Sequence, residues 1–527
     1  MDNNKTQNQE TSMVTKIMGL FALVVLCAHP LVVTDAYFNI LETKYLFYCG
    51  TVITMLVLLI GCGFFNDKIV QFFEEFNLKL ILKSLSLVDW AMIAFWVANV
   101  LSWVFCEEWR HEAFWGTSGR YNGVFLMTLY MVVYFCVTRL FELKRWYLDA
   151  FLATGMIVCL FGITDYFQMD IMSFKVNMID SQKGIYTSTL GNINTYTVFV
   201  AAVMVVSTIL FATEKNGKKI AWYYVNMVIS CFALIMGASD NAYLSLAALF
   251  GLSPLYLFRT KRGTSRYLVS IATFFTVIMC IDWINGAFGD TVVGIESAFA
   301  IIAGVSFLPI IVLALWAVAG GMTYILLKKN AQQASEAMPK WLMYIWYGVI
   351  VLVVGTVAFA FYDATFAGNS ERYGALAPYV TFNDAWGTNR GYAWRCAMEI
   401  WSQKLTPVQK IFGYGADTFR LLMYYYFSAD IINGQQVVYD SVHNEYLNFL
   451  LTIGIVGMLA YIAFLFAAVA KMWKHMNEDP DVAAILFVVV AYMVQATINI
   501  NLPILMPIIL QLLLMGVAKV RQQEKIK

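Results

Sequence analysis

Long apolar segments separated by short polar connectors run through the whole chain. Most of these segments are roughly 17–25 residues long, the length that an α-helix needs to cross a lipid bilayer. Repeated segments of this kind indicate a polytopic helical membrane protein, because backbone groups inside a bilayer must satisfy one another. The pattern predicts spans at residues 14–34, 45–64, 89–106, 121–140, 146–166, 192–212, 220–238, 241–258, 267–283, 298–326, 341–362, 444–470, 482–498 and 503–518. Since several connectors are short, we expect an all-α transmembrane helical bundle of about 12–14 spans.

Positive charges alternate from one connector to the next. Connectors such as 139–145 and 259–266 are rich in Lys and Arg, whereas the short turns at 239–242 and 499–501 contain neither. Lys and Arg accumulate in cytoplasmic loops, so this alternation predicts that both termini are cytoplasmic. It also places residues 363–443 outside, as one long extracytoplasmic loop that contains short helices.

The predicted topology divides the chain into four regions. These are N-terminal spans with an interfacial cytoplasmic helix at 65–88, a central transmembrane core, the long outer loop and the C-terminal spans. Their predicted bounds are 1–118, 119–362, 363–443 and 444–527. Charged residues make up 13% of the chain, against about 25% in soluble domains. The net charge of +1 does not indicate a nucleic-acid partner. The nine cysteines have no metal-ligand spacing, and we expect neither a metal nor another cofactor.

Three polar segments lie beside predicted spans on the outer side. Arg120 precedes the fourth span, where it either positions an anion or extends its charge to the membrane surface. Asn192 and Asn194 open the sixth span, either as helix caps or as a small nest for an anion or a hydroxyl group. Asp240 lies in the turn between the seventh and eighth spans, where a carboxylate is costly unless it caps a helix or is paired.

The long outer loop carries further cations. Its segment 388–401 is predicted to be helical, and Arg395 and Glu399 have the spacing of a pair on one helix face. Arg390 precedes this helix and has no such local partner in the sequence. Arg420 follows a glycine-containing turn further along the loop.

The loop ends in the stretch Tyr439–Leu451, which places an imidazole and a carboxylate at the start of the next span. Asp440 or Ser441 can cap that helix, and His443 would then lie in its first turn. The chain has four histidines, so one beside a carboxylate at the membrane rim stands out. His443 is therefore either an interfacial residue that satisfies the helix end or a proton acceptor.

If the substrate is a lipid-linked sugar diphosphate held at the outer leaflet, its reaction needs residues of these types. Arginine binds phosphate oxygens in pairs and keeps its charge, so it stabilises a diphosphate leaving group. An acceptor hydroxyl becomes a good nucleophile when a histidine or a carboxylate takes its proton. Arg120, Arg390, Arg395 and His443 supply both functions without a metal. The sequence contains no Walker-type phosphate loop, dinucleotide-binding fingerprint or zinc-protease motif.

Several motifs together resemble the superfamily of O-antigen ligases and O-antigen polymerases, which are membrane glycosyltransferases. The most specific motif is His443-Asn444-Glu445-Tyr446-Leu447-Asn448, followed by Gly454 and Gly457. The others are Gly119-Arg120 with Gly123, Gly191-Asn192-Ile193-Asn194, Ser239 with Ala242-Tyr243-Leu244, Arg390-Gly391-Tyr392 with Trp394-Arg395, and Phe412-Gly413-Tyr414-Gly415 with Phe419. The resemblance extends from about residue 115 to residue 515.

The resemblance implies a metal-independent, inverting glycosyltransferase in the bacterial cytoplasmic membrane. Its expected partners are an undecaprenyl-diphosphate-linked glycan, a hydroxyl acceptor on a glycan, lipid or cell-wall component, and the lipid bilayer. By this analogy Arg390 and Arg120 hold the diphosphate, and His443 orients or deprotonates the acceptor. The expected catalytic residues are His443, Arg390 and Glu445. The expected substrate-binding residues are Arg120, Arg395, Asn192, Asn194, Asp240 and Arg420.

The turn Ser239-Asp240-Asn241 departs from the family pattern, because many relatives have Ser-Arg-Gly there. A phosphate-binding arginine is then missing, and Arg395, Arg372 or Arg420 can replace it. Ligase and polymerase both stay open, since the acceptor decides between them. The alternative function is a transporter or flippase of lipid-linked saccharides. Transporters tend to contain internal repeats, and the sequence shows none.

Overall fold

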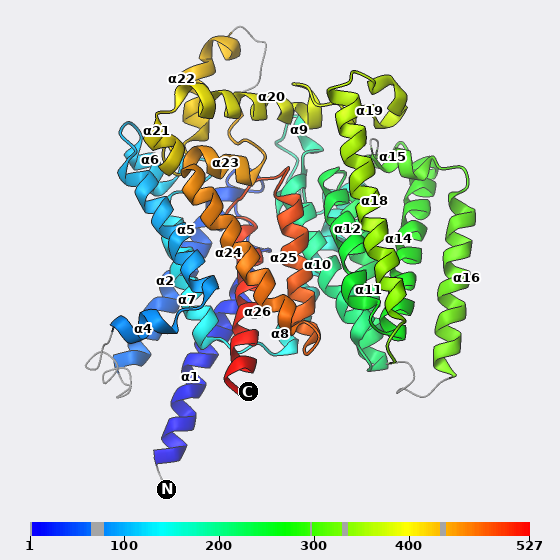
Figure 1. The fold of residues 1–527 in the computed structure, drawn as a ribbon, viewed down its shortest axis with the longest axis horizontal. Coiled ribbons are helices and arrows are strands. Elements are labelled where there is room, and N and C mark those ends of the chain that lie inside the picture. The colour runs from blue at the N-terminus through cyan, green and yellow to red at the C-terminus, as the bar shows by residue number, and fades with distance from the viewer. Residues whose placement is uncertain (1–2, 65–77, 296–297, 329–335, 433–438, 527) are drawn as a thin grey trace. The chain divides into compact units, whose positions relative to one another are not determined.

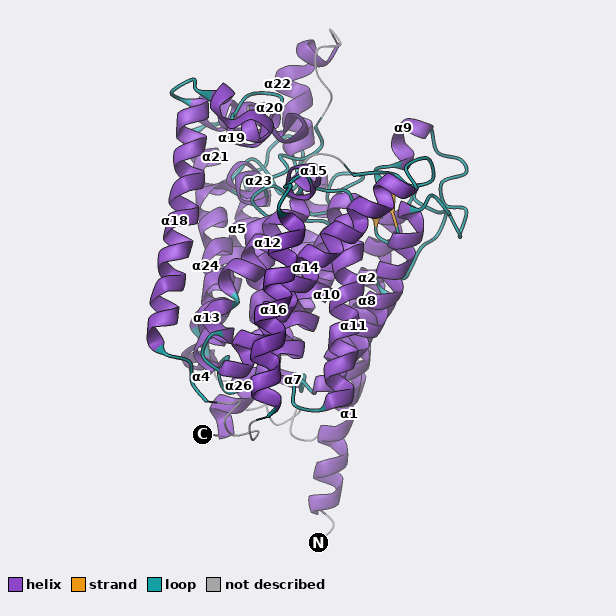
Figure 2. Ribbon diagram, turned by 90° about the vertical axis from the view of Figure 1, so that its right-hand side faces the viewer, coloured by secondary structure: helices purple, strands orange, loops and turns teal. Residues whose placement is uncertain are grey.

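The computed structural model describes residues 3–64, 78–295, 298–328, 336–432 and 439–526, and these are mostly helical (Figure 2). The short strands β1 (Tyr186–Thr187) and β2 (Gly191–Asn192) form the one sheet within these ranges, and they are antiparallel. The predicted all-α fold is confirmed.

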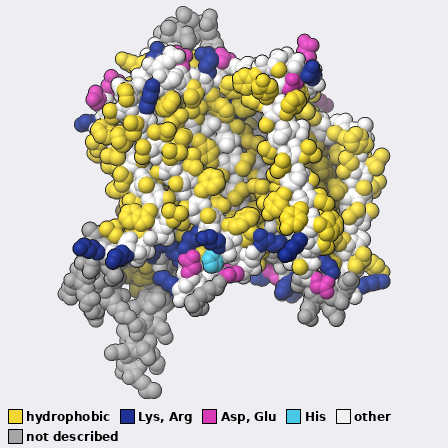
Figure 3. Space-filling model, in the orientation of Figure 1, with side chains coloured by type: hydrophobic (Ala, Val, Ile, Leu, Met, Phe, Trp, Pro, Cys, Tyr) yellow, Lys and Arg dark blue, Asp and Glu magenta, His cyan; other side chains and the backbone are white. Residues whose placement is uncertain are grey.

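The described helices have the length and composition of membrane spans. Nine of them are long and apolar enough to cross a membrane. Shorter apolar helices lie at Met13–Ala28, Val124–Leu140, Asn241–Leu257 and Pro480–Gln495. Hydrophobic side chains cover the middle of the helices, and Lys and Arg gather toward their ends (Figure 3). The chain is therefore a multi-pass helical membrane protein, whereas the span count and the side on which its termini lie stay predictions.

The chain forms two compact units. Unit 1 contains residues 1–154, 397–489 and 500–527, and unit 2 contains residues 155–396 and 490–499. The helices α8 (Arg145–Tyr166), α20 (Trp386–Glu399) and α25 (Pro480–Gln495) carry the chain from one unit to the other. The four regions predicted from the sequence are divided by the side of the membrane on which each loop is expected, so they differ from these two units. That division stays a prediction.

Unit 1 is a helical bundle with short helices at one end. Its remaining elements are α1 (Asn3–Leu23), the π-helix η1 (Val24–Ala28), α2 (Ile40–Phe64), α4 (Leu78–Ser84), α5 (Leu87–Val104), α6 (Arg110–Trp115), α7 (Val124–Leu140), the π-helix η3 (Ile400–Lys404), α21 (Pro407–Phe412), α22 (Phe419–Ile432), α23 (Glu445–Thr452), α24 (Gly454–His475) and α26 (Met506–Ile526). Helix α5 packs against α24, and α7 packs against α26. The short helices α6, α21 and α23 lie at the end of this bundle opposite to the C-terminus (Figure 1). We call it the loop end of unit 1.

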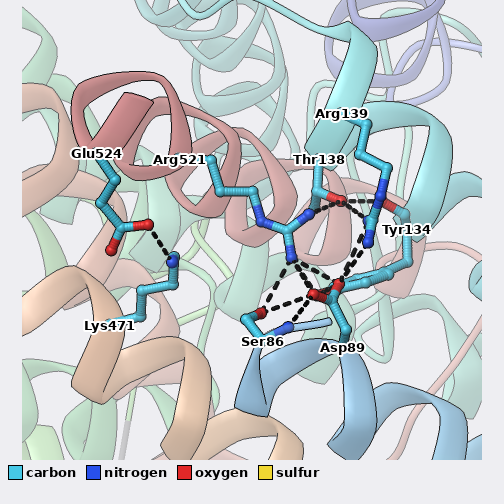
Figure 4. A network of polar contacts seen from close by, with 8 residues as sticks. All are labelled: Ser86, Asp89, Tyr134, Thr138, Arg139, Lys471, Arg521 and Glu524. Carbon is cyan, nitrogen blue, oxygen red and sulfur yellow. Dashed lines mark hydrogen bonds and ion pairs between the residues drawn. The ribbon is translucent and has the colours of Figure 1, made fainter. Parts of the chain in front are cut away.

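A network of ion pairs fixes three helices of unit 1 (Figure 4). The Asp89 side chain of α5 is 1% exposed and pairs with Arg521 of α26 at 2.5 Å and with Arg139 of α7 at 3.2 Å. The Tyr134 hydroxyl donates to Asp89 at 2.8 Å, and the Ser86 backbone N–H donates to it at 2.8 Å. Breaking a buried ion pair by removing one partner is strongly destabilising. Asp89 therefore holds α5, α7 and α26 in a fixed arrangement.

Unit 2 is built around one enclosed helix. Its remaining elements are α9 (Asp180–Lys183), β1, β2, α10 (Ile193–Thr213), α11 (Gly217–Met236), α12 (Asn241–Leu252), α13 (Pro254–Leu257), α14 (Lys261–Ala287), α15 (Ala298–Ala303), α16 (Leu308–Leu327), α18 (Lys340–Thr365), the 3₁₀ helix η2 (Ser370–Leu376) and α19 (Ala377–Val380). Every residue of α10 from Thr195 to Ala212 is buried. A helix that is apolar on all sides is expected to be enclosed, and α11, α12 and α14 pack around it.

Two predicted spans are each two helices. The predicted span 298–326 consists of α15 and α16, because Pro309 in the first turn of α16 cannot continue a preceding helix. The predicted span 444–470 consists of α23 and α24, which meet at Gly454 with φ of +72°. The single helices predicted there are wrong. The predicted interfacial helix at 65–88 lies partly outside the described residues, which contain α4 from this stretch.

Candidate active site

Arg120 lies in a tight loop between α6 and α7 of unit 1. Gly116 begins the loop with φ of +91°, and a Cβ there would lie 2.5 Å from the Tyr121 backbone, so a glycine is required. The backbone N–H groups of Arg120 and Tyr121 both donate to the Thr117 carbonyl at 3.0 Å. Arg120 therefore sits in a closed turn that ends before α7 begins at Val124.

Asp417 holds both ends of this loop. Its Oδ2 accepts hydrogen bonds from the Thr117 backbone N–H at 2.8 Å, the Thr117 hydroxyl at 3.0 Å and the Asn122 backbone N–H at 3.1 Å. Burial raises the pKa of Asp417 to about 6, although these hydrogen bonds favour the ionised form. The residues that Asp417 binds lie on either side of Arg120 in the sequence, so Asp417 fixes the backbone from which that guanidinium projects.

The Arg120 guanidinium forms an ion pair with Asp440. The Arg120 side chain is 10% exposed, whereas the Asp440 side chain is 46% exposed. The Nε of Arg120 is buried and has no hydrogen-bond partner among the described residues. Leaving a buried donor unsatisfied is costly, so this guanidinium is well placed to bind a further acceptor.

His443 directly precedes the residue that caps α23. Asn444 is this cap, because its Oδ1 accepts a hydrogen bond from the Leu447 backbone N–H at 3.0 Å. The predicted cap by Asp440 or Ser441 is wrong, and so is the placement of His443 in the first helical turn. His443 has φ of +53°, and its backbone N–H donates to the Ser441 hydroxyl at 3.2 Å. Such a conformation is uncommon for a residue other than glycine, and strained residues of this kind cluster at functional sites.

Glu445 begins α23 and is 2% exposed. Its Oε1 accepts hydrogen bonds from the Tyr461 hydroxyl at 2.8 Å and from Nδ2 of Asn501 at 3.0 Å. The Asn501 carbonyl in turn accepts a hydrogen bond from Nδ2 of Asn122 at 2.6 Å. Continuous hydrogen bonds therefore connect the loop that carries Arg120 with the start of α23.

A glycine turn brings the segment of Asp417 against the break between α23 and α24. The backbone N–H groups of Tyr414 and Gly415 donate to the carbonyls of Leu451 at 3.1 Å and Thr452 at 3.0 Å. Gly413 has φ of +88°, and a Cβ there would lie 2.2 Å from the Thr452 carbonyl oxygen. The loop end of unit 1 is thus closed by backbone contacts that larger residues would prevent.

Arg420 is a second cation beside the Arg120 loop. Its Nη1 donates to the Ser118 carbonyl at 3.3 Å. Of the three arginines predicted as replacements for the missing one, Arg420 lies in unit 1. The other two lie in unit 2. Arg372 pairs there with Asp363 at 3.4 Å, and Arg395 pairs with Asp384 at 2.7 Å.

In unit 2, two of the predicted polar segments lie together. Asn192 caps α10 as predicted, since its side chain accepts a hydrogen bond from the Asn194 backbone N–H at 2.8 Å. The Oδ1 of Asn194 accepts hydrogen bonds from the Ser239 hydroxyl at 2.7 Å and from Nδ2 of Asn241 at 2.9 Å. Asp240 stands at the N-cap position of α12, but its side chain makes no cap hydrogen bond to that helix. Instead, the carboxylate of Asp240 accepts a hydrogen bond from the Tyr379 hydroxyl of α19 at 3.0 Å.

Arg390 and Arg395 both lie on α20, on the part that belongs to unit 2, so the predicted position of Arg390 before the helix is wrong. Nη1 of Arg390 donates to the Gly387 carbonyl at 3.0 Å. Arg395 binds both oxygens of Asp384, at 2.8 and 2.7 Å, and its guanidinium holds the pKa of Asp384 below its usual range. Asp384 is not among the partners predicted from the sequence for Arg395. Predicted site residues therefore lie in both units, and the structure describes each unit by itself.

Residues 292–462 match the family model described as O-antigen ligase. The matched segment, about a third of the chain, is therefore similar to the O-antigen ligases. The match confirms the resemblance found in the sequence, and the segment that carries it includes Arg390, Arg395, Arg420, His443 and Glu445. No curated protein matches the chain. This similarity supports an enzyme of glycan transfer at a membrane, in O-antigen-type assembly.

Two residues of this candidate site, Asp417 and Asn501, are not among the predicted site residues. Asp417 stands two residues after Gly415, in a motif used for the resemblance, and a carboxylate beside a tight turn is a frequent acceptor of backbone hydrogen bonds. Asn501 lies in the predicted outer turn 499–501, which drew attention only because it lacks Lys and Arg. Its two partners come from distant parts of the chain, so sequence alone carries no signal for them.

Proposed function

We propose that this protein, like the O-antigen ligases that it resembles, moves a glycan from undecaprenyl diphosphate to a hydroxyl acceptor. The reaction takes place at the outer side of the bacterial cytoplasmic membrane, and it is either ligation or polymerisation. The observation that carries the proposal is the Arg120 guanidinium, which is nearly buried and faces the Asp440 carboxylate. Carboxylate and phosphate oxygens are equivalent partners for an arginine, so a site that holds one suits the other.

In this proposal Arg120 and Arg420 bind the diphosphate of the donor in unit 1. Arg420 reaches the backbone of the Arg120 loop, which brings a second positive charge to the same loop. Neutralising the diphosphate makes it a better leaving group, because negative charge builds on its oxygens as the bond to the sugar breaks. Arg390 lies in unit 2, and its role as a diphosphate ligand is proposed from the family resemblance alone.

His443 is the proposed general base. Its nitrogen takes the proton of the acceptor hydroxyl while the hydroxyl oxygen attacks the anomeric carbon of the donor sugar. The bond from that carbon to the diphosphate oxygen breaks in the same step, and the diphosphate leaves with both electrons. A single displacement of this kind inverts the anomeric centre and needs no metal in the proposed scheme.

Glu445 and Asp417 are proposed to position the reacting groups. Glu445 accepts two hydrogen bonds at one nearly buried oxygen and fixes the start of α23, two residues after His443. Asp417 fixes the loop of Arg120 through three hydrogen bonds. Both carboxylates therefore act through the residues that they hold.

The polar residues of unit 2 are proposed to bind the sugars. Asn192, Asn194 and Asp240 offer amide and carboxylate groups of the kind that bind sugar hydroxyls. Asp384 binds two nitrogens of Arg395, whereas Arg120 keeps a buried Nε with no hydrogen-bond partner among the described residues. Arg395 is therefore less suited to a diphosphate and better suited to an indirect role in glycan binding.

The proposal is tested by measuring glycan transfer with purified protein. A labelled polyprenyl-diphosphate-linked glycan is incubated in detergent with a hydroxyl acceptor, and the product is separated by chromatography. Arg120→Ala, Arg390→Ala and His443→Ala should each lower the transfer rate by at least ~10²-fold, which is the usual contribution of a charge stabiliser or a positioned base. Lys183→Ala is the matched control, because Lys183 pairs with the highly exposed Asp180 away from these residues in the sequence.

Two other outcomes of the transfer assay would each contradict part of the proposal. Near-normal transfer by the Arg120 and His443 variants would refute the site while leaving the family activity intact. Absence of transfer, together with movement of the labelled lipid across vesicles that contain the protein, would favour the transporter instead. Detergent-solubilised protein separates these cases, because transfer needs no second compartment.

A further inference from the structure

An apolar groove of about 500 Å³ lies between the α1–η1 segment and α2 in unit 1. Its walls include Val24 and Ala28 of η1 and Leu46 and Phe47 of α2. Thr51 also lines it, but the Thr51 hydroxyl donates to the Phe47 carbonyl of its own helix at 2.7 Å. The groove therefore offers a hydrocarbon surface along most of its length.

The sequence of α2 creates this groove. Gly50 lies in its wall, and a Cβ at Gly50 would meet no atom within 4 Å. The flanking side chains of Leu20 and Leu46 are 57% and 58% exposed, so the groove opens to the outside of the bundle. At one end, the fully buried Lys44 donates to the carbonyls of His29 and Pro30 at 2.8 and 3.0 Å. This bond pair fixes α2 against the end of η1 and keeps the groove walls in place.

The same end of the groove lies beside the Arg120 loop. The Tyr45 ring stacks on the Tyr121 ring, with 4.7 Å between centroids and 14° between planes. Tyr121 follows Arg120 directly, while Leu46 and Phe47 of the groove follow Tyr45. From Leu46 to the last lining residue of α2, the groove runs along about 18 Å of helix, more than half of a hydrocarbon core of about 30 Å.

We propose that this groove binds the polyprenyl chain of the lipid carrier. The inference rests on the proposed function, because it takes Arg120 as a ligand of the donor diphosphate. With the diphosphate at Arg120, the first isoprene units pass Tyr45, and the following units lie along Leu46, Phe47 and Gly50. The chain buries apolar surface that otherwise faces the mixed lipids of the bilayer.

The position of the groove favours a polyprenyl chain over a phospholipid acyl chain. An acyl chain has no reason to prefer this part of the lipid-facing surface over any other apolar stretch of the bundle. A polyprenyl diphosphate is anchored by charge at one end, so its chain must leave the Arg120 loop along the surface that begins there. The stacked pair of Tyr45 and Tyr121 marks that exit.

The first experiment maps the chain directly. Undecaprenyl diphosphate with a photoreactive group in its chain and no sugar is crosslinked to the purified full-length protein, and labelled peptides are identified by mass spectrometry. Label should appear on residues 17–28 and 46–58 and should decrease when unlabelled undecaprenyl diphosphate is added. Label elsewhere, or label that an excess of phosphatidylglycerol removes equally well, would overturn the proposal.

The second experiment fills the groove. Gly50→Trp places a bulky ring in the space, and Gly61→Trp is the matched control because Gly61 lies on the same helix, also has open space around it and is not part of the groove wall. Gly50→Trp should lower crosslinking in the groove and raise the KM for the donor by about tenfold or more, while Gly61→Trp should change neither. Equal behaviour of the two variants would contradict a chain-binding groove.

The two experiments distinguish failure of the groove from failure of the proposed function. Crosslinking reports chain binding whether or not glycan is transferred, and it uses the wild-type protein. If the label maps outside the groove while Arg120→Ala abolishes transfer, the groove is wrong and the function stands. If the label maps to the groove but no acceptor receives glycan, the chain-binding site stands and the transfer reaction is wrong.

Discussion

Asp440→Asn removes the negative charge that faces the Arg120 guanidinium. In the proposed function the donor diphosphate binds this guanidinium, so it must replace Asp440 as the partner of Arg120. The variant keeps the size of the side chain and a hydrogen-bond acceptor, but it competes less well for the cation. Asp440→Asn is therefore expected to bind a diphosphate more tightly than the wild-type protein.

The size of the effect follows from the exposure of the two partners. The Arg120 side chain is 10% exposed, but the Asp440 side chain is 46% exposed, so water screens the pair from one side. Pairs of this kind contribute about 0.2–1 kcal/mol. Since about 1.4 kcal/mol corresponds to a tenfold change in Kd, the Kd for a diphosphate should fall by roughly 1.4- to 5-fold.

The assay measures the Kd for farnesyl diphosphate in detergent by calorimetry, at low and at high salt. Asp180→Asn is the matched control, because Asp180 pairs with Lys183 on an exposed short helix and should leave the Kd unchanged. Weaker binding by Asp440→Asn would refute the reasoning, because it would mean that Asp440 orients Arg120 for the ligand. An unchanged Kd would show that the diphosphate does not bind at Arg120.

Three further outcomes are expected. Arg120→Lys keeps the charge but loses the planar fork, so its transfer rate should fall about tenfold; a rate no higher than that of Arg120→Ala would contradict a role of charge. His443→Gln should lower kcat by about 10²-fold and leave the donor KM unchanged, whereas a changed KM alone would assign His443 to binding. Asp417→Ala should lower the Tm, because three hydrogen-bond donors lose their acceptor and the free energy of unfolding falls by about 3 kcal/mol or more. Asp417→Asn keeps an oxygen for the same donors and should be tolerated. The pKa of Asp417 is raised to about 6, above about 4 in an unfolded chain, so the folded protein binds the proton more tightly. The contribution of Asp417 to the free energy of unfolding should therefore increase as the pH falls from about 6 to 4. If the Tm of Asp417→Asn shows the same pH dependence as the Tm of the wild-type protein, Asp417 is not the group that titrates.

The fold was predictable because its strongest signal is repeated many times. Apolar segments of membrane-spanning length recur throughout the chain, and each one is independent of the others. The errors fall where a span is interrupted. Pro309 and Gly454 are single residues inside apolar stretches, and hydrophobicity alone does not report the backbone conformation that they impose. Proline and glycine inside an apolar stretch are the local signals for such breaks.

The polar residues of the site were predictable by type but not by partner. Arg120 and His443 stand out because cations and imidazoles are rare beside spans. Their surroundings are set by contacts between distant segments, such as that of Arg120 with Asp440, 320 residues away. The local rule that Asp440 caps the next helix failed because Asn444 is closer to the helix start and takes that role. Helix capping is a local competition, whereas ion pairing depends on the assembled bundle.

The use of each carboxylate in unit 1 supports the proposed division of roles. Asp417 and Glu445 are each held by several donors at a single oxygen, and Glu445 is nearly buried. The donors already occupy these oxygens, which leaves neither carboxylate well placed to accept a proton from an acceptor hydroxyl. Asp440 is committed to Arg120 by charge. Among the described residues at the loop end of unit 1, His443 therefore fits the base best, and its left-handed backbone is a cost that this role explains.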